Sequence, residues 1–227
     1  FTTDNFVDAF QQMNFMNILK NSLIITCVSV FLIILFSSMA AYIFVRKAWK
    51  INQIIFMVML FSMVIPFQVV MIPLISIYGG TFGILNHRAT LIFMHLGFSV
   101  SMAVFMFHGF IKGGVPISLE EAAQIDGAGP IQLFFKVTIP LLTPTIFFVM
   151  ITSIISGFQV FDVIYMMIGK TNPAYANTQT VVMLFYRQAF DYGYKGYAAA
   201  ISILIFAVIM LVTVIQMIGQ KKWVNYD

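Results

Sequence analysis

The side chains of this chain that combine chemistry with a defined spacing lie in one polar stretch, residues 118–130. It carries three acids, Glu120, Glu121 and Asp126, and the last of them is followed directly by Gly127. Ser118 and Glu121 stand three residues apart, which predicts a capping box at a helix start, and Pro116 just upstream also suits such a start. Gly127 is predicted to end that helix, because glycine enters the left-handed region at little cost. Pro130 is then predicted to begin a second short helix.

Other reactive groupings are not suggested by the sequence. The three histidines, His87, His95 and His108, are scattered and do not have metal-ligand spacing. There is no glycine-rich phosphate loop ending in Lys-Ser or Lys-Thr. No Ser/His/Asp or Cys/His grouping indicates a membrane protease. We therefore expect that the chain is not an enzyme and binds no metal and no cofactor of its own.

The composition predicts an integral membrane protein. Of the 227 residues, 61% are hydrophobic and 9% are charged, and the mean hydropathy is +0.97. Soluble domains carry roughly 25% charged residues, so this chain has too few to cover a soluble surface. The net charge of +4 is assigned to loops beside a membrane and not to nucleic-acid binding. The expected fold is an all-α, polytopic membrane helical bundle.

Five apolar runs are long enough for membrane spans, which need about 20 residues. They are residues 21–45, 51–77, 89–111, 141–168 and 196–218. Pro66 and Pro73 lie inside the second run and are expected to kink or interrupt it. Residues 169–195 form a polar connection, in which Val181, Leu184 and Phe185 suggest a short surface helix.

The basic residues predict the orientation of these spans. Seven fall on one side: Arg46, Lys47, Lys50, Lys112, Lys136, Lys221 and Lys222. Five fall on the other: Lys20, Arg88, Lys170, Arg187 and Lys195. The bias is small by number but sharper by position, because the bases at 46–47 and 221–222 adjoin spans. Residues 118–130 are therefore expected in the cytoplasm.

The spacing around Glu121 resembles the cytoplasmic "EAA" loop of ABC importer permeases. Glu121-Ala122-Ala123, Gly127, Val137 and Ile139-Pro140 fall on the family pattern without a gap. The family more often has Ile and Leu where Val137 and Ile139 stand. Shorter matches along the chain resemble the carbohydrate-importer, maltose-permease-like branch: Asn21-Ser22, Ala40-Ala41-Tyr42, Ile65-Pro66, Ile72-Pro73 and Gly83-Ile-Leu-Asn86.

This resemblance implies a single permease domain, residues 1–227, with the fold of a type I ABC importer. It would have an extracytoplasmic leader (1–20), a cytoplasmic coupling loop (113–140) and a cytoplasmic tail (219–227). A further membrane span is expected before Phe1. The implied location is a bacterial or archaeal cytoplasmic membrane. The implied partners are a second, homologous permease subunit, two ATPase subunits that bind ATP and Mg, and an extracytoplasmic substrate-binding protein.

Two sets of site residues follow. The resemblance implies that Glu120, Glu121, Ala122, Ala123, Asp126, Gly127 and Pro140 couple the chain to the ATPase. Five residues are candidates for the substrate path. Sugar hydroxyls need polar partners, which could be Gln159, Asp162, Gln68 and Ser101, and the ring of Phe158 could stack on a sugar ring. Against this, the favoured explanation of Asp162 is an interfacial acid paired with Lys170 or another loop base. Aromatic and hydroxyl side chains in spans more often serve packing.

The expected function is ATP-driven import of a sugar or oligosaccharide. Glycerol-phosphate or another polyol is an alternative substrate within the same class. An ion-coupled secondary transporter would be expected to bury more acids or to show broken helices in repeated halves. Neither that class nor a non-transporting membrane scaffold accounts for the EAA loop.

Overall fold

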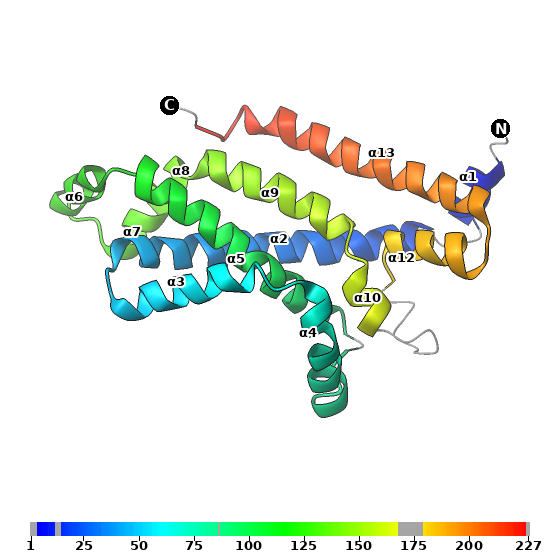
Figure 1. The fold of residues 1–227 in the computed structure, drawn as a ribbon. Helices are drawn as coiled ribbons and strands as arrows, with labels where there is room; N and C mark the ends of the chain where they lie inside the picture. Colours follow the sequence, from blue (N-terminus) through cyan, green and yellow to red (C-terminus); the bar gives the residue numbers. More distant parts are fainter. Residues whose placement is uncertain (1–3, 12–14, 86, 168–178, 226–227) are drawn as a thin grey trace. The chain divides into compact units, whose positions relative to one another are not determined.

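The computed structural model describes residues 4–11, 15–85, 87–167 and 179–225, which contain helices and no strand. Four helical segments in this part of the chain are long and apolar enough to cross a membrane. They are α2 (Phe15–Arg46), α5 (Arg88–Gly114), the segment Thr143–Tyr165 and α13 (Lys195–Gln220). The third segment contains α9 (Thr143–Phe158) and the start of α10 (Asp162–Met167). Figure 1 shows these segments in colours that follow the sequence.

The second apolar run is interrupted, as its prolines predict. It forms α3 (Lys50–Ser62), α4 (Phe67–Leu74) and the π-helical stretch η1 (Ile75–Thr81). Pro66 is the N-cap residue of α4, and Pro73 lies inside α4, shortly before the change to π-helix. Proline lacks the amide hydrogen that a continuous helix needs, which explains a break here. If the two pieces form one span, the spans number five, as expected.

Shorter helices connect the long ones. They are α1 (Asp4–Gln11), α6 (Ile117–Ile125), α7 (Pro130–Leu133), η2 (Phe134–Thr138), α8 (Ile139–Leu141), α12 (Val181–Tyr186) and η3 (Arg187–Asp191). The prediction of a helix at 181–185 is confirmed, but its placement at the surface is wrong. Val181 and Leu184 are 1% and 6% exposed, because they pack into a core formed by distant segments. Residues 168–178, which include Lys170, lie outside the described residues.

The start of α2 also differs from the expected span. The helix begins at Phe15, six residues before the charge-free run, and Lys20 lies within its first turns. A single lysine does not break a helix, because it is a good helix former. Phe15 is 1% exposed, so these additional turns take part in packing.

The contacts divide the chain into two compact units whose segments interleave. Unit 1 contains residues 1–30, 66–96 and 153–215, and unit 2 contains residues 31–65, 97–152 and 216–227. Four of the boundaries fall inside continuous helices, so no linker separates the units.

Unit 1 has an apolar core with two clusters. Ile25, Leu91, Met94, Ile164 and Met183 form one, and Phe15, Ile18, Val181, Leu184 and Ile201 form the other. The amide of Val181 donates to the Ser22 hydroxyl at 3.2 Å, which ties α12 to α2. At Gly157 a Cβ atom would come within 2.7 Å of Thr26, so glycine permits the close approach of α9 to α2.

Unit 2 is built around the buried face of α5, which includes Val104, Phe107 and Ile111, each 0% exposed. The amide of Asn225 donates to Thr143 at 2.9 Å, so the tail after α13 is held at the start of α9. The chain passes from the end of α5 through α6 and returns through α7 towards α9 (Figure 1). This return places the polar stretch of the sequence in unit 2.

Candidate functional site

The helix α6 carries the predicted EAA residues and begins differently from the prediction. Its N-cap residue is Pro116, which makes no side-chain cap hydrogen bond. Ser118 therefore lies inside the first turn, and the predicted capping box with Glu121 is wrong. The extended backbone at Pro116 starts the helix two residues earlier than a serine cap would.

The end of α6 agrees with the prediction. Gly127 has φ +86°, in the left-handed region that favours glycine. Its amide donates to the Gln124 carbonyl, and the Ala128 amide donates to the Ala123 carbonyl, both at 2.9 Å. This pair of bonds is the Schellman arrangement, which satisfies the last carbonyls of a helix.

Glu120 is bound within a buried polar network. Its carboxylate receives three short hydrogen bonds from Arg46, with Nε at 3.0 and 3.1 Å and Nη2 at 2.9 Å. The Tyr42 and Thr138 hydroxyls add bonds at 3.3 Å each. Arg46 Nη2 also donates to the Val115 carbonyl at 2.8 Å. The Arg46 and Glu120 side chains are 12% and 6% exposed, so water screens this pair little.

The remaining side chains of α6 point mainly outward. Glu121, Ala122 and Asp126 are exposed and Ala123 is half-buried. Ile125 is 87% exposed, and Ile131 on the following helix is 75% exposed. The two glutamates therefore differ in environment: Glu120 is bound by its own chain, and Glu121 is exposed.

The return segment, residues 128–141, is helical almost throughout. Pro130 is the first residue of α7, as predicted, and the Gly129 amide donates to Gln132 Oε1 at 3.1 Å. The π-helical stretch η2 brings Thr138 to Glu120, and Pro140 lies near the start of α8. Exposed Ile131 and the buried network were missed by sequence reasoning. Arg46, which closes the first long apolar run, was read only as a signal of orientation.

The predicted path residues are dispersed. Gln159, Asp162 and Gln68 are exposed and belong to unit 1. Phe158 is 2% exposed, so its ring is enclosed by its own unit. Ser101 belongs to unit 2, where its hydroxyl lies 3.0 Å from that of Ser62. The structure therefore leaves the Gln68, Gln159 and Asp162 side chains exposed and buries Phe158 and Ser101.

An aromatic cluster beside Asp162 was not predicted. Phe161, Tyr165 and Tyr186 lie with ring centroids 4.8 to 5.2 Å apart, and Phe190 lies 5.0 Å from Tyr186. Phe190 is 69% exposed, and the Tyr165 and Tyr186 hydroxyls are 3.4 Å apart. Phe161 and Tyr165 lie just before and within α10, whereas Tyr186 and Phe190 lie in α12 and η3, so the sequence positions do not reveal the grouping.

Unit 1 also contains buried polar atoms without a hydrogen-bond partner among the described residues. They are Thr26 Oγ1, Ser29 Oγ, His95 Nε2 and Gln188 Oε1. Such atoms usually find a protein or water partner, and unpaired ones are rare. Within the described part of the chain, no three His, Cys, Asp or Glu side chains are grouped to hold a metal ion.

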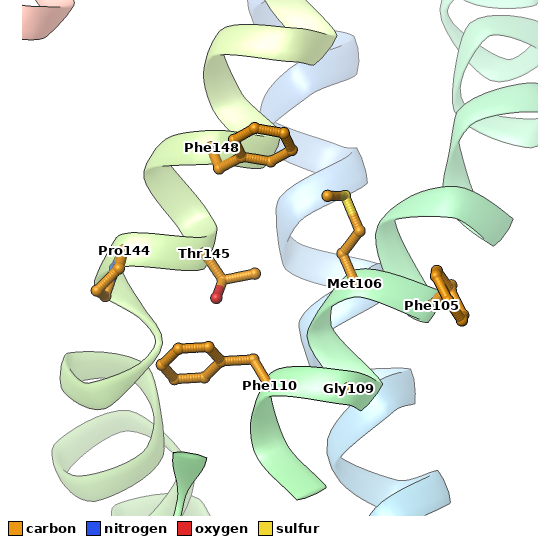
Figure 2. Close-up of a pocket in the computed structure, with 7 residues that line it drawn as sticks. All are labelled: Phe105, Met106, Gly109, Phe110, Pro144, Thr145 and Phe148. Atoms are coloured by element: carbon orange, nitrogen blue, oxygen red, sulfur yellow. The ribbon is translucent and has the colours of Figure 1, made fainter. Parts of the chain in front are cut away.

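An open groove of about 580 Å³ lies in unit 2, lined from α5 and α9 (Figure 2). Its lining residues are Phe105, Met106, Gly109, Phe110, Pro144, Thr145 and Phe148. Thr145 carries the one hydroxyl among these seven described residues, as the close-up shows. The groove is therefore suited to an acyl chain or an apolar side chain and not to a sugar.

Residues 33–224 match the family model described as "Binding-protein-dependent transport system inner membrane component". The chain belongs to this family. The matched residues include α6 and the whole return segment. With its long apolar helices, this inner membrane component is a multi-pass membrane protein.

Curated relatives of this inner membrane component share about half of their length with it. It is 44% identical over 142 residues, or 63% of the chain, to the "Probable starch degradation products transport system permease protein AmyC" of Thermoanaerobacterium thermosulfurigenes, and spans 51% of that protein. It is 37% identical over 140 residues, or 62% of the chain, to the "Melibiose/raffinose/stachyose import permease protein MelC" of Bacillus subtilis, and spans 50% of it.

Solved structures support the fold. One chain, from the crystal structure of "a bacterial ABC transporter involved in the import of the acidic polysaccharide alginate", matches with a TM-score of 0.82 at 18% identity. The match covers 99% of this inner membrane component and 85% of the other chain. The predicted fold of an ABC importer permease is therefore confirmed.

Proposed function

We propose that this chain is one membrane-spanning subunit of an ATP-driven importer of sugars or oligosaccharides, and that α6 is its contact with a separate ATPase. The observation that carries the proposal is the outward presentation of α6. Glu121, Ala122 and Ile125 are exposed on a helix whose end is fixed by a Schellman turn. A short helix with small, apolar and acidic side chains at its surface is suited to seat in a groove with a basic rim.

The solute class rests on the relatives. The curated proteins named above are named for starch degradation products and for melibiose, raffinose and stachyose. In this chain, exposed Gln159 and Asp162 supply hydrogen-bonding groups, and the neighbouring aromatic rings of Phe161 and Tyr165 supply apolar faces. This combination suits sugars, which present hydroxyl edges and apolar ring faces.

The assembly we propose contains a second permease subunit, two ATPase subunits and an extracytoplasmic binding protein. ATP and Mg would bind the ATPase subunits. One chain of similar fold comes from a bacterial alginate ABC transporter in complex with an "alginate pentasaccharide-bound periplasmic protein", which supports the binding protein as a partner. The positions of the basic residues favour a cytoplasmic location for α6 and for the tail after α13.

The direct test is purification of the full-length, tagged subunit from its source organism in mild detergent. We expect an ATPase chain to be retained and ATP hydrolysis to be stimulated by the binding protein loaded with maltotriose or raffinose. Radiolabelled glycerol 3-phosphate serves as the competing probe for the polyol alternative. Retention of no ATPase would overturn the coupling proposal, and uptake of glycerol 3-phosphate alone would overturn the sugar class.

A further inference from the structure

We propose that the buried ion pair between Arg46 and Glu120 is a rigid link that makes α6 and the end of α2 move as one body. Arg46 and Glu120 are then positioning residues for energy coupling, distinct from the exposed residues that contact a motor. The proposal rests on the proposed function, because it requires a partner that displaces α6. It concerns how a movement of α6 is transmitted to α2, and not which molecule binds to α6.

The first observation is how little of α6 is attached to its own chain. The helix is described throughout, and Glu120 is its single buried residue. The exposed residues on either side of Glu120 make α6 a helix that lies on the protein and not within it. A force on α6 therefore reaches the remainder of unit 2 through its covalent ends, through its contacts with α7 and η2, and through this one buried carboxylate.

The second observation is the geometry of the contact. Arg46 is the last residue of α2, and its guanidinium approaches both oxygens of Glu120 at 2.9 to 3.1 Å. A planar guanidinium bonded to both carboxylate oxygens restricts rotation as well as distance, because both groups are directional. Apolar side chains in the same place would pack but could slide past one another.

The third observation is that the network holds both flanks of α6. The Arg46 guanidinium also binds the Val115 carbonyl, which precedes the helix, at 2.8 Å. Thr138, which follows it, donates to the same carboxylate at 3.3 Å. The entry, the first turn and the exit of the loop therefore converge on the end of α2.

The cost of burying charge also favours a geometric role for this ion pair. Burying an ion pair carries a large desolvation cost, and well-packed apolar residues are often equally stabilising or more so. The gain from a charged pair at this position is therefore fixed geometry. Fixed geometry distinguishes this ion pair, as a rigid link, from a contact that serves packing alone.

The test uses the complete, purified transporter with Cys27→Ala as background. Spin labels are placed at Gln124→Cys on α6 and Ile43→Cys on α2, both exposed positions. Distances are measured without nucleotide and with ATP plus vanadate, which requires no solute. With the pair intact, we expect one narrow distance distribution that is the same in both states.

Glu120→Gln removes the charge and keeps the shape of the side chain. We expect it to broaden the distance distribution and to shift it between nucleotide states. ATPase subunits should be retained, but stimulation of hydrolysis should fall about tenfold, as expected when a charge-assisted hydrogen bond is lost. Arg46→Lys, which keeps the charge but loses the planar fork, should give an intermediate result.

Glu121→Gln is the matched control, because it removes the same charge from the adjacent, exposed glutamate. It should leave the distance distribution narrow even if it weakens ATPase retention. A distance that changes between nucleotide states with the pair intact would overturn the link, as would a narrow distribution and full stimulation in Glu120→Gln. The failure of the proposed function differs from both, because the purified complex would then contain no ATPase.

Discussion

The two units treat their polar side chains in different ways. In unit 2, Glu120 and Arg46 are buried together and fully engaged, and Ser101 is paired with Ser62. In unit 1, Thr26 and His95 bury polar atoms that have no partner in the described part of the chain. Unit 2 has one such case, the Gln216 amide.

The difference concerns how far the buried polar groups of each unit satisfy one another's hydrogen bonds. A polar network whose members satisfy one another holds a single geometry. Buried polar atoms without partners need water, another chain or a solute, and the need is stronger in a membrane, where the surroundings offer no hydrogen bonds. We infer that the polar network of unit 2 holds one local geometry, whereas the buried polar atoms of unit 1 have no partner among the described residues that would do the same.

The largest expected effect is on the labelling of two residues that are predicted to lie on opposite sides of the membrane. The positions of the basic residues predict that Gln124, in unit 2, is cytoplasmic and that Tyr194, in unit 1, is extracytoplasmic. Single cysteines at these positions, in the Cys27→Ala background, should differ all-or-none in labelling by an impermeant reagent added to intact cells. Rapid labelling at residue 124 from outside would contradict the orientation and the cytoplasmic role of α6.

Next in size is the effect of added bulk on α6. Ala123 is half-buried on a helix that is exposed elsewhere, so Ala123→Trp inserts a large ring at the proposed contact. Overpacking costs about 1–3 kcal/mol, which corresponds to a loss of ATPase retention of roughly 5- to 150-fold. Retention is measured by the amount of ATPase that copurifies.

Gln124→Ala is the control for that prediction, because it removes bulk from an exposed side chain on the same helix. It should change retention much less than the tryptophan. Gly127→Val tests the same helix by another route, since φ +86° strains a β-branched residue. Normal retention and stimulation in both bulky variants would show that α6 does not carry the coupling.

A smaller effect is expected in unit 1. Asp162 is exposed and opens α10 beside the aromatic cluster. If it binds the solute, Asp162→Ala should lower uptake roughly tenfold, which corresponds to the loss of one hydrogen bond to a charged group. Expression and ATPase retention should be unchanged. Unaltered uptake would leave Asp162 as an interfacial acid.

The smallest effects compare equivalent substitutions in the two units. Thr138 and Thr26 are both 0% exposed, but Thr138 donates to Glu120 and Thr26 Oγ1 has no partner in the described residues. Thr138→Val should lower the free energy of unfolding by about 1 kcal/mol or more, whereas Thr26→Val should be neutral or stabilising. Denaturant titration of the purified chain in detergent measures both. Equal losses would mean that Thr26 has a hydrogen-bond partner outside the described chain, such as a bound water.

Several features of the fold were predictable because their causes are local. The long helices follow from apolar runs of the length that a bilayer requires. The break before Phe67 follows from Pro66, and the end of α6 follows from Gly127. Each of these signals acts over a few residues, so neighbouring sequence suffices to read it.

The failures also have physical causes. The capping box at Ser118 was wrong because Pro116 starts the helix first. The helix at Val181 was placed at the surface, but segments distant in sequence cover it. In both cases a plausible local pattern was overruled by the conformation or the packing of residues outside it.

The amino-acid sequence by itself determined that this chain lies in a membrane, where its helices fall and which loop carries the EAA pattern, because composition, proline, glycine and spacing act locally. Only the tertiary structure decided that Glu120 turns inward to Arg46, 74 residues away, while Glu121 turns outward. The residue type alone does not distinguish two adjacent glutamates. Their difference arises from helical rotation and from the arginine that packing brings to one of them.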